Sequence, residues 1–303
     1  MSELLIVGSA ALDSIKTPQV NKPFLLGGAA CYASVAASFF SATSIVAAVG
    51  TDFPPKYIEL LKNCKIDLSD FQQLEGKTFS WAGEYEEDMN IRRTTHLDMG
   101  VFESFQPIIS SNNKKTPFVL LSNITPELQL HVLEQMESPI FVMADTIDHH
   151  IKNSLPAMKT LLKKIDCFTV NDSEARLLTE ENNLFLAAKK IHKMGPSIVI
   201  IKKGEHGSIV SYSSGVFLAP AYPLERPIDP TGAGDTFAGA LMGYIASHVK
   251  TKDEISQVIR QSVLIGASTA SYCCEGFGFQ KITAISKADI LNRAKQLEEM
   301  ISF

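Results

Sequence analysis

The sequence predicts an α/β fold, a sandwich in which helices cover both faces of a mostly parallel sheet. Six short apolar runs have the length and composition of buried strands. Segments with helical periodicity lie between them, and this alternation is typical of parallel strands joined by crossover helices. The predicted strands are Leu4–Val7, Ile45–Val49, Phe118–Leu121, Ile140–Met143, Cys167–Val170 and Ile198–Ile201. The predicted helices are Pro126–Met136, Ile151–Lys163, Ser173–Leu178 and Phe185–Met194.

The composition is that of an enzyme with one large core. The chain has 303 residues, 45% of them hydrophobic, and its net charge of −5 supplies no basic face. We therefore expect no nucleic acid polymer as a partner. No apolar segment is long enough to cross a bilayer, which predicts a cytoplasmic protein without a membrane partner.

The five cysteines form no Cys-x-x-Cys pair, so neither a disulfide scaffold nor a zinc site is indicated. His206 and the pair His149 and His150 lack metal-ligand partners at suitable spacing, so we expect solvent-facing side chains.

Near the N-terminus, the first predicted strand leads to Asp13. Further on, Gly27 and Gly28 precede a predicted helix of small residues, Cys31–Phe40. A carboxylate accepts hydrogen bonds from two neighbouring hydroxyl groups, and paired glycines let the backbone approach a ligand closely. On the glycines alone, a structural turn is the default interpretation.

The stretch from Lys77 to Phe102 interrupts the alternation of strands and helices. Its residues Thr78 to Tyr85 have the aromatic and alternating character of a strand, and a charged segment follows. We expect a separate small sheet here, with an ordinary surface hairpin as the alternative. Trp81, the only tryptophan, lies within this stretch.

Two polar motifs follow buried strands later in the chain. Residues 171–174 read Asn-Asp-Ser-Glu, and residues 202–207 read Lys-Lys-Gly-Glu-His-Gly. The carboxyl ends of parallel strands share one edge of a sheet, and ligands bind there. We therefore expect Asn171, Lys202 and the turn before Asp235 to lie along that edge.

The most informative segment runs from Asp229 to Gly239 and reads Asp-Pro-Thr-Gly-Ala-Gly-Asp-Thr-Phe-Ala-Gly. Its glycines let backbone N–H groups approach a ligand, and the start of the following helix adds partial positive charge, so the turn can hold an anion. Asp235 stands beside this cradle, where a carboxylate takes the proton from a hydroxyl nucleophile during phosphoryl transfer. The pairing predicts a kinase. In the alternative interpretation, Gly232 and Gly234 only make a tight turn and Asp235 complements the helix dipole.

This segment resembles the C-terminal signature of the PfkB family of carbohydrate kinases, the ribokinase-like proteins, and the resemblance extends over nearly the whole chain. It implies a ribokinase-like three-layer α/β/α sandwich with a mostly parallel central sheet, formed by residues 1–303 as a single kinase domain. It also implies a small β-lid over the substrate, for which residues 12–26 and 77–99 are the candidate segments. A lid excludes water, which otherwise competes as phosphoryl acceptor.

The same resemblance assigns the catalytic turn. The anion hole of the family corresponds to Gly232, Ala233 and Gly234. Asp235 corresponds to the general base. Asp229 and Thr231 fall where family members often bind a monovalent cation, so dependence on K⁺ is a hypothesis.

The family's acceptor site corresponds to Asp13, Gly27 and Gly28. Tyr32 stands where many members carry an asparagine that contacts substrate hydroxyls. Tyr32 therefore either stacks on a nucleoside base or fills a packed helix face. Trp81 either covers the substrate or packs in the core of the lid.

Asn171 and Glu174 match the family's Asn-x-x-Glu motif, which helps to position magnesium and the phosphates. Mg²⁺ prefers oxygen ligands and commonly keeps waters, so Glu174 would act through water. The local alternative is a helix cap, in which Asp172 or Ser173 caps the helix and Glu174 complements its dipole.

Residues 202–207 resemble the family's nucleotide-binding turn, which in many members reads Thr-x-Gly-x-x-Gly. Gly204 and Gly207 are the matching glycines. Lys202 stands where the threonine would be, and a lysine meets a phosphate as a point charge.

The leading hypothesis is an ATP-dependent phosphotransferase that uses Mg²⁺ and acts on a hydroxymethyl group of a sugar. A nucleoside kinase of the adenosine, inosine or cytidine type is the alternative, supported by Tyr32 and Trp81. A phosphosugar acceptor would instead meet Arg92, Arg93 and His96 near the lid. From a different class, a nucleotide- or sugar-binding regulator would keep the fold without turnover. Exposed apolar strands of the lid would be covered by a homodimer formed through the lid.

Overall fold

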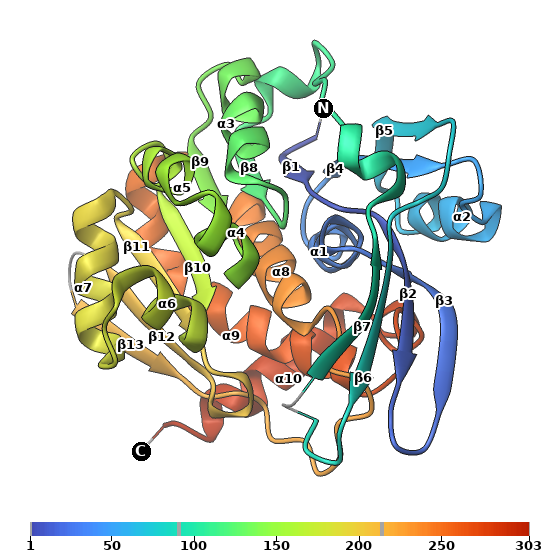
Figure 1. The fold of residues 1–303 in the computed structure, drawn as a ribbon. Coiled ribbons are helices and arrows are strands. Elements are labelled where there is room, and N and C mark those ends of the chain that lie inside the picture. Colours follow the sequence, from blue (N-terminus) through green and yellow to red (C-terminus); the bar gives the residue numbers. More distant parts are fainter. Residues whose placement is uncertain (1, 90–91, 213–214, 303) are drawn as a thin grey trace.

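The computed structural model describes residues 2–89, 92–212 and 215–302, apart from the side chain of Arg92. Within these residues the strands form a nine-stranded and a four-stranded sheet (Figure 1). The larger sheet has the strand order β13-β12-β11-β10-β9-β8-β1-β4-β5. Its strands are β1 (Leu4–Val7), β4 (Thr43–Gly50), β5 (Asp67–Leu74), β8 (Phe118–Leu121), β9 (Phe141–Ala144), β10 (Cys167–Asn171), β11 (Ile198–Lys202), β12 (Ser208–Tyr212) and β13 (Gly215–Ala219). Neighbours from β11 to β5 run parallel, whereas β12 and β13 are antiparallel additions at one edge.

Helices cover both faces of the larger sheet, so the predicted three-layer α/β/α sandwich is confirmed (Figure 1). Successive residues of β1 point to opposite faces, because Leu4 and Ile6 belong to one hydrophobic core and Leu5 and Val7 to the other. The helices on the first core are α1 (Ala29–Ser38), α2 (Pro55–Asn63), α8 (Ala233–His248), α9 (Ile255–Cys274) and α10 (Lys287–Glu299). Those on the second are α3 (Pro126–Gln135), α4 (Asp148–Asn153), α5 (Leu155–Leu162), α6 (Asp172–Thr179) and α7 (Leu184–Met194). No helix in the described part of the chain combines the length and apolar character needed to cross a lipid bilayer.

Short 3₁₀ segments connect several of these elements. They are η1 (Gly100–Ser104), η2 (Asn113–Lys115), η3 (Gly204–His206), η4 (Lys252–Glu254) and η5 (Ile282–Ala284).

The prediction of one helix over Ile151–Lys163 is wrong. The segment contains the end of α4 and the whole of α5, and the break lies at Ser154, whose φ of −129° and ψ of 31° are not helical. Pro156 lies in the first turn of α5, where its missing N–H costs no helical hydrogen bond. The proline therefore starts a new helix instead of continuing the old one.

The smaller sheet has the order β3-β2-β6-β7 and is built from two separated parts of the chain (Figure 1). Its strands are β2 (Ala11–Lys16), β3 (Asn21–Gly27), β6 (Ser80–Tyr85) and β7 (Arg92–Asp98). The outer pairs are antiparallel, while β2 and β6 run parallel to each other. The aromatic stretch around Trp81 thus pairs directly with the strand that carries Asp13.

Candidate active site

One cavity of about 1230 Å³ lies where the carboxyl ends of the central strands meet the smaller sheet. Asn171 ends β10, Lys202 ends β11, and the two residues are paired in register. The cavity brings together Asp13, Gly28, Tyr32, Trp81, Asn171, Glu174, Lys202, Thr231, Gly232, Gly234 and Asp235. Five further residues that the sequence assigns to catalysis or binding do not line it; these are Gly27, Ala233, Gly204, Gly207 and Asp229.

The glycine turn before α8 depends on the absence of a side chain at Gly232. Gly232 is the N-cap of α8 and has a φ of 77°, a left-handed conformation that glycine adopts without strain. A Cβ atom at this position would lie 2.5 Å from the ring of Tyr32. The turn therefore rests on an aromatic ring, and Gly232 and Gly234 line the cavity at the start of α8. The Ala233 N–H donates to the carbonyl oxygen of Pro230 at 3.1 Å.

Tyr32 packs rather than projecting freely into the cavity. It is 1% exposed, and its ring stacks on Phe279 with centroids 4.3 Å apart and an interplanar angle of 16°. Its hydroxyl has no hydrogen-bond partner among the described residues. Burial, followed by the charges of nearby groups that include Asp13 and Asp235, raises the pKa of Tyr32.

Lys202 brings a positive charge to the glycine turn. Its Nζ atom lies 2.8 Å from Oδ2 of Asp145 and 3.2 Å from the position that a Cβ atom of Gly234 would occupy. Burial alone would lower the pKa of Lys202, but the carboxylates of Asp145, Glu174 and Asp235 raise it overall. Lys202 therefore remains a cation beside the anion cradle.

Asn171 and Glu174 form a reciprocal cap at the start of α6. The Asn171 Oδ1 atom accepts a hydrogen bond from the Glu174 N–H at 2.8 Å, and Glu174 Oε2 accepts one from the Asn171 N–H at 2.7 Å. The capping residue is thus Asn171, and the expectation that Asp172 or Ser173 caps the helix is wrong. Burial, and next the charge of Asp145, raise the pKa of Glu174 to about 7. Among the described residues, no group of three or more His, Cys, Asp or Glu side chains is arranged to hold a metal by itself.

The carboxylate of Asp13 lies against the backbone of Gly27. Asp13 is 5% exposed, and a Cβ atom at Gly27 would lie 2.0 Å from Asp13 Oδ2. Gly28 has a φ of 92°, and a Cβ atom there would lie 2.5 Å from the carbonyl oxygen of Ser9. The two glycines therefore make room for Asp13 and for the start of α1.

Aromatic side chains form a wall of the same cavity, which sequence reasoning identified only at Trp81. Phe79, Phe102 and Phe105 stack in series, with successive centroids 5.7 Å apart and interplanar angles of 20° and 21°. Trp81 Nε1 donates to Thr94 Oγ1 at 3.2 Å. Phe102 and Phe105 belong to the second hydrophobic core, so they support the half-buried Phe79 from behind, and Phe79 and Trp81 are the aromatic side chains with surface left for the cavity.

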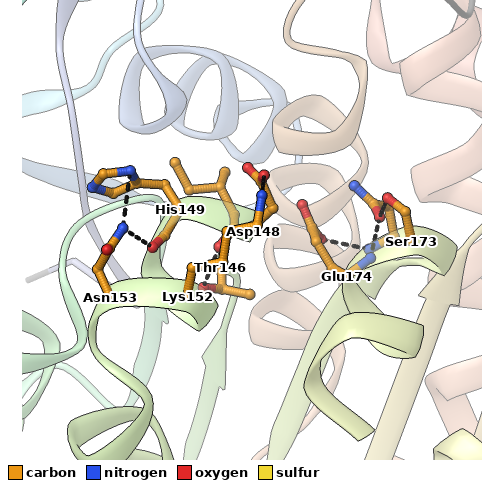
Figure 2. Close-up of polar contacts among 9 residues, drawn as sticks. Thr146, Asp148, His149, Lys152, Asn153, Ser173 and Glu174 are labelled. Carbon is orange, nitrogen blue, oxygen red and sulfur yellow. Dashed lines mark hydrogen bonds and ion pairs between the residues drawn. The ribbon is translucent and has the colours of Figure 1, made fainter. Parts of the chain in front are cut away.

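Helix α4 contributes polar groups that the sequence analysis did not place here. His149 and Lys152 of α4 line the cavity together with Ser173 and Glu174 of the neighbouring helix α6 (Figure 2). The expectation of a solvent-facing side chain is wrong for His150, which is 9% exposed and has its Nε2 atom 3.0 Å from Asn123 Oδ1. Burial, and next the charge of His149, lower the pKa of His150 from 6.5 to about 4.

Gly204 and Gly207 turn the chain from β11 into β12. Both have positive φ, 54° and 77°, and a Cβ atom at Gly207 would lie 2.0 Å from the carbonyl oxygen of Ala219. Glycine is therefore needed at these two positions for the backbone conformation of the turn.

Asp229 is fully buried behind the glycine turn. Its Oδ1 atom accepts a hydrogen bond from the Thr231 N–H at 2.9 Å, and Oδ2 accepts one from the Gly278 N–H at 3.3 Å. Burial raises the pKa of Asp229. Thr231 Oγ1 lies 2.8 Å from the hydroxyl of Tyr85 on β6, so the smaller sheet contacts the turn directly.

Arg93 and His96 on β7 are the described side chains that would bind the phosphate of a phosphosugar acceptor. Arg93 pairs with Glu84 at 2.8 Å, and His96 Nε2 lies 3.4 Å from Ser80 Oγ. Neither side chain lines the cavity, and the side chain of Arg92 lies outside the described residues.

Comparisons with known proteins identify the family and the fold. The family model described as pfkB family carbohydrate kinase matches residues 10–284. A cytidine kinase of Thermococcus kodakarensis is 27% identical over 289 residues, which cover 93% of this chain and 100% of that protein. The solved structure of a Burkholderia thailandensis nucleoside kinase in complex with inosine has a TM-score of 0.78 and 19% identity, covering 97% of this chain and 96% of that one. An Arabidopsis thaliana ribokinase complexed with ribose and ATP has a TM-score of 0.77 and 20% identity, covering 97% and 99%. The chain belongs to the pfkB family of carbohydrate kinases and is therefore a kinase, an enzyme that transfers phosphoryl groups.

Proposed function

We propose that the protein transfers the γ-phosphoryl group of ATP to the hydroxymethyl group of a nucleoside. The observation that carries this proposal is the joint presence, in one cavity, of Asp13 and of an aromatic wall in which half-buried Phe79 stacks on the buried rings of Phe102 and Phe105. Asp13 would accept hydrogen bonds from ribose hydroxyls, and the aromatic wall would contact a planar base. The relative that is a cytidine kinase supports the same acceptor class.

In this proposal Asp235 is the general base. It takes the proton of the acceptor hydroxyl while that oxygen forms a bond to the γ-phosphorus of ATP and the bond from the phosphorus to the bridging oxygen of ADP breaks. The N–H groups of Gly232 and Gly234, with the Lys202 ammonium group, stabilise the charge that develops on the phosphoryl oxygens, whereas the Ala233 N–H is bonded to the Pro230 carbonyl oxygen and supports the turn. Gly204 and Gly207 would shape the turn on the nucleotide side.

The polar groups of the cavity fit a magnesium ion that arrives with ATP. Glu174 supplies a carboxylate at the cavity, and Asn171 holds this carboxylate through its backbone N–H. Mg²⁺ is commonly bound by few protein oxygens together with waters and substrate phosphates. A bound Mg²⁺ would neutralise phosphate charge, with Glu174 holding one of its waters. The lack of a multidentate cluster among the described residues agrees with an ion held largely by the nucleotide.

A potassium ion near Asp229 and Thr231 would offset the buried negative charge of Asp229. Because Asp229 binds the backbone of the glycine turn, such an ion would stabilise the turn. Equal turnover in sodium and potassium buffers would remove this part of the proposal.

A free sugar is the second candidate acceptor. Asp13, Gly27 and Gly28 match the family's sugar-binding positions, and the similar Arabidopsis protein was solved with ribose and ATP. A free sugar would leave the aromatic wall without a partner. The two acceptor classes therefore predict different responses to changes in that wall.

The test is ADP release from ATP and Mg²⁺ with ribose, fructose, adenosine, inosine and cytidine. We expect one nucleoside to be phosphorylated, and Asp235→Asn to lower kcat by roughly 10²- to 10⁴-fold because it removes the base. Asp253→Asn makes the same chemical change on exposed η4 and should leave kcat unchanged. Activity on free sugars alone would reject the nucleoside, and an unaffected Asp235→Asn would reject the base. ATP binding without transfer to any acceptor of the panel would favour a regulator.

A further inference from the structure

The pair of Lys202 and Asp145 differs from the other lysine ion pairs of the described residues. Its side chains are 19% and 7% exposed, whereas the lysine side chain of every other such pair is at least 44% exposed. Taking an ammonium and a carboxylate out of water costs free energy that a solvent-exposed pair does not incur. Because both residues line the cavity, we expect this buried pair to have a function in the candidate site.

Asp145 is held firmly in place. It directly follows β9, and its Oδ1 atom accepts a hydrogen bond from the Thr146 N–H at 2.8 Å. The fully buried side chain of Gln129 donates from Nε2 to the carbonyl oxygen of Asp145 at 3.0 Å, and also to those of Leu121 and Ser122 at the end of β8. The carboxylate therefore presents Oδ2 to Lys202 from a fixed backbone.

Lys202 has other carboxylates close by. The charges of Glu174 and Asp235 act on its ammonium group in addition to that of Asp145. Without Asp145, the flexible lysine would be drawn toward these two groups. A lysine paired with Asp235 would stabilise the ionised carboxylate and weaken it as a base.

We propose that Asp145 is a positioning residue that holds the Lys202 ammonium group beside Gly234 and away from Asp235. Lys202 then directs its charge to the phosphoryl group that the N–H groups of the glycine turn would bind. The sequence has lysine where many family members carry threonine, and Asp145 supplies the partner that this lysine requires. The inference rests on the proposed transfer of phosphate from ATP.

The test is a double-mutant cycle that combines Asp145→Asn with Lys202→Thr, measured once an acceptor is known for the unmodified protein. With Lys202 present, we expect Asp145→Asn to lower kcat/KM for ATP by about tenfold or more, mainly through kcat. The Lys202→Thr protein has no ammonium group for Asp145 to hold. In that background the same Asp145→Asn change should alter kcat/KM by less than about threefold.

Equal losses on Asp145→Asn in both backgrounds would overturn the proposal, because Asp145 would then act independently of Lys202. Asp145→Ser is a second variant if Asp145→Asn does not fold, since serine also accepts the Thr146 N–H and carries no charge. Lys252→Thr is the matched control, because Lys252 is 59% exposed and pairs with Asp166, just before the amino end of β10. It should leave kcat/KM unchanged.

Binding gives a readout that does not need turnover. A non-hydrolysable ATP analogue is titrated by calorimetry into the four proteins of the cycle in EDTA, so that no metal takes part. We expect the effect of Asp145→Asn on affinity to differ by about threefold or more between the background that keeps Lys202 and the Lys202→Thr background. Equal effects would again overturn the role of Asp145. An unmodified protein that transfers no phosphate would instead reject the proposed function.

Discussion

Gly232 shows how one residue without a side chain shapes the candidate site. Its positive φ and its contact with the ring of Tyr32 are separate constraints, and alanine would violate both. We expect Gly232→Ala to lower the free energy of unfolding by about 1–3 kcal/mol and to reduce turnover by roughly tenfold or more, because the N–H groups of the turn move. Thermal unfolding and steady-state kinetics measure the two effects.

Gly215→Ala is the matched control for backbone strain. Gly215 has a φ of 145°, and a Cβ atom there would meet no atom within 4 Å. Gly215→Ala therefore introduces backbone strain without a steric clash. Because Gly215 does not line the cavity, the substitution should not affect turnover. If Gly232→Ala behaved like Gly215→Ala in both assays, the contact with Tyr32 would not matter.

His150 predicts a loss of stability in acid. Its pKa is about 4 in the folded protein and 6.5 in its ordinary state, so the unfolded chain binds the proton more tightly. The contribution of His150 to stability is therefore fully present above pH 6.5 and is lost as the pH decreases from 6.5 to about 4, by up to about 3 kcal/mol. Glu174, whose pKa is raised to about 7, acts in the opposite direction, so the comparison of variants isolates His150. Denaturant unfolding at several pH values should show a shallower decline for His150→Gln than for the unmodified protein. The exposed neighbour provides the control, and a decline that His149→Gln changed as much would contradict the assignment.

At the scale of elements, the sequence patterns identify the centre of the sheet better than its edges. The central strands β1, β8 and β9 are buried along their whole length, so they read as continuous apolar runs. Edge strands β5 and β13 are exposed or half-buried at all but one position each. Charged and polar residues interrupt β5, and the apolar residues of β13 are too few beside its glycine to separate this strand from a loop. Their pairing depends on neighbours far away in the sequence, which a local pattern does not contain.

In the candidate site too, the sequence identifies residues in local motifs and misses residues whose partners are far away in the chain. Motifs within one strand-to-helix turn, such as Asn171 to Glu174, lie at the cavity where the local pattern places them. Asp145 was missed because a single aspartate after an apolar run carries no spacing signal, and its partner Lys202 lies 57 residues away. Phe102 and Phe105 were missed because they lie in and after η1, where neither helical nor strand periodicity marks the face that meets the cavity.

The start of α6 yields a prediction that separates capping from catalysis. Asn171 caps α6 and lies at the cavity, whereas Asn183 caps α7 by accepting from the N–H groups of Phe185 and Leu186 and does not line the cavity. Alanine at either position should cost about 1 kcal/mol of stability through the lost cap. Only Asn171→Ala should also lower turnover, because it removes a polar side chain that lines the cavity, whereas the Asn171 N–H that holds Glu174 Oε2 remains. Equal turnover in the two variants would limit Asn171 to a structural role.

At the scale of the whole molecule, the two sheets enclose one cavity between them. Side chains of the smaller sheet, such as Trp81 and Leu97, line the same space as Lys202 and Asp235 of the larger body. The contact between Tyr85 and Thr231 joins the two directly at the glycine turn. This arrangement supports the proposed role of the smaller sheet as a lid that excludes water from phosphoryl transfer.

The outer side of the smaller sheet supports a prediction about assembly. Phe24 on β3 is 65% exposed and Val20, just before that strand, is 36% exposed, so an edge strand carries apolar side chains into solvent. A second copy of the chain that pairs through this sheet would cover them. We expect light scattering to give the mass of a dimer, and Phe24→Asp to shift it toward the monomer because a buried carboxylate without a partner is costly. Leu218→Asp is the control, since Leu218 is 60% exposed on β13 at the far edge of the larger sheet. A monomer at every concentration, or a dimer that only Leu218→Asp disrupts, would exclude assembly through the smaller sheet.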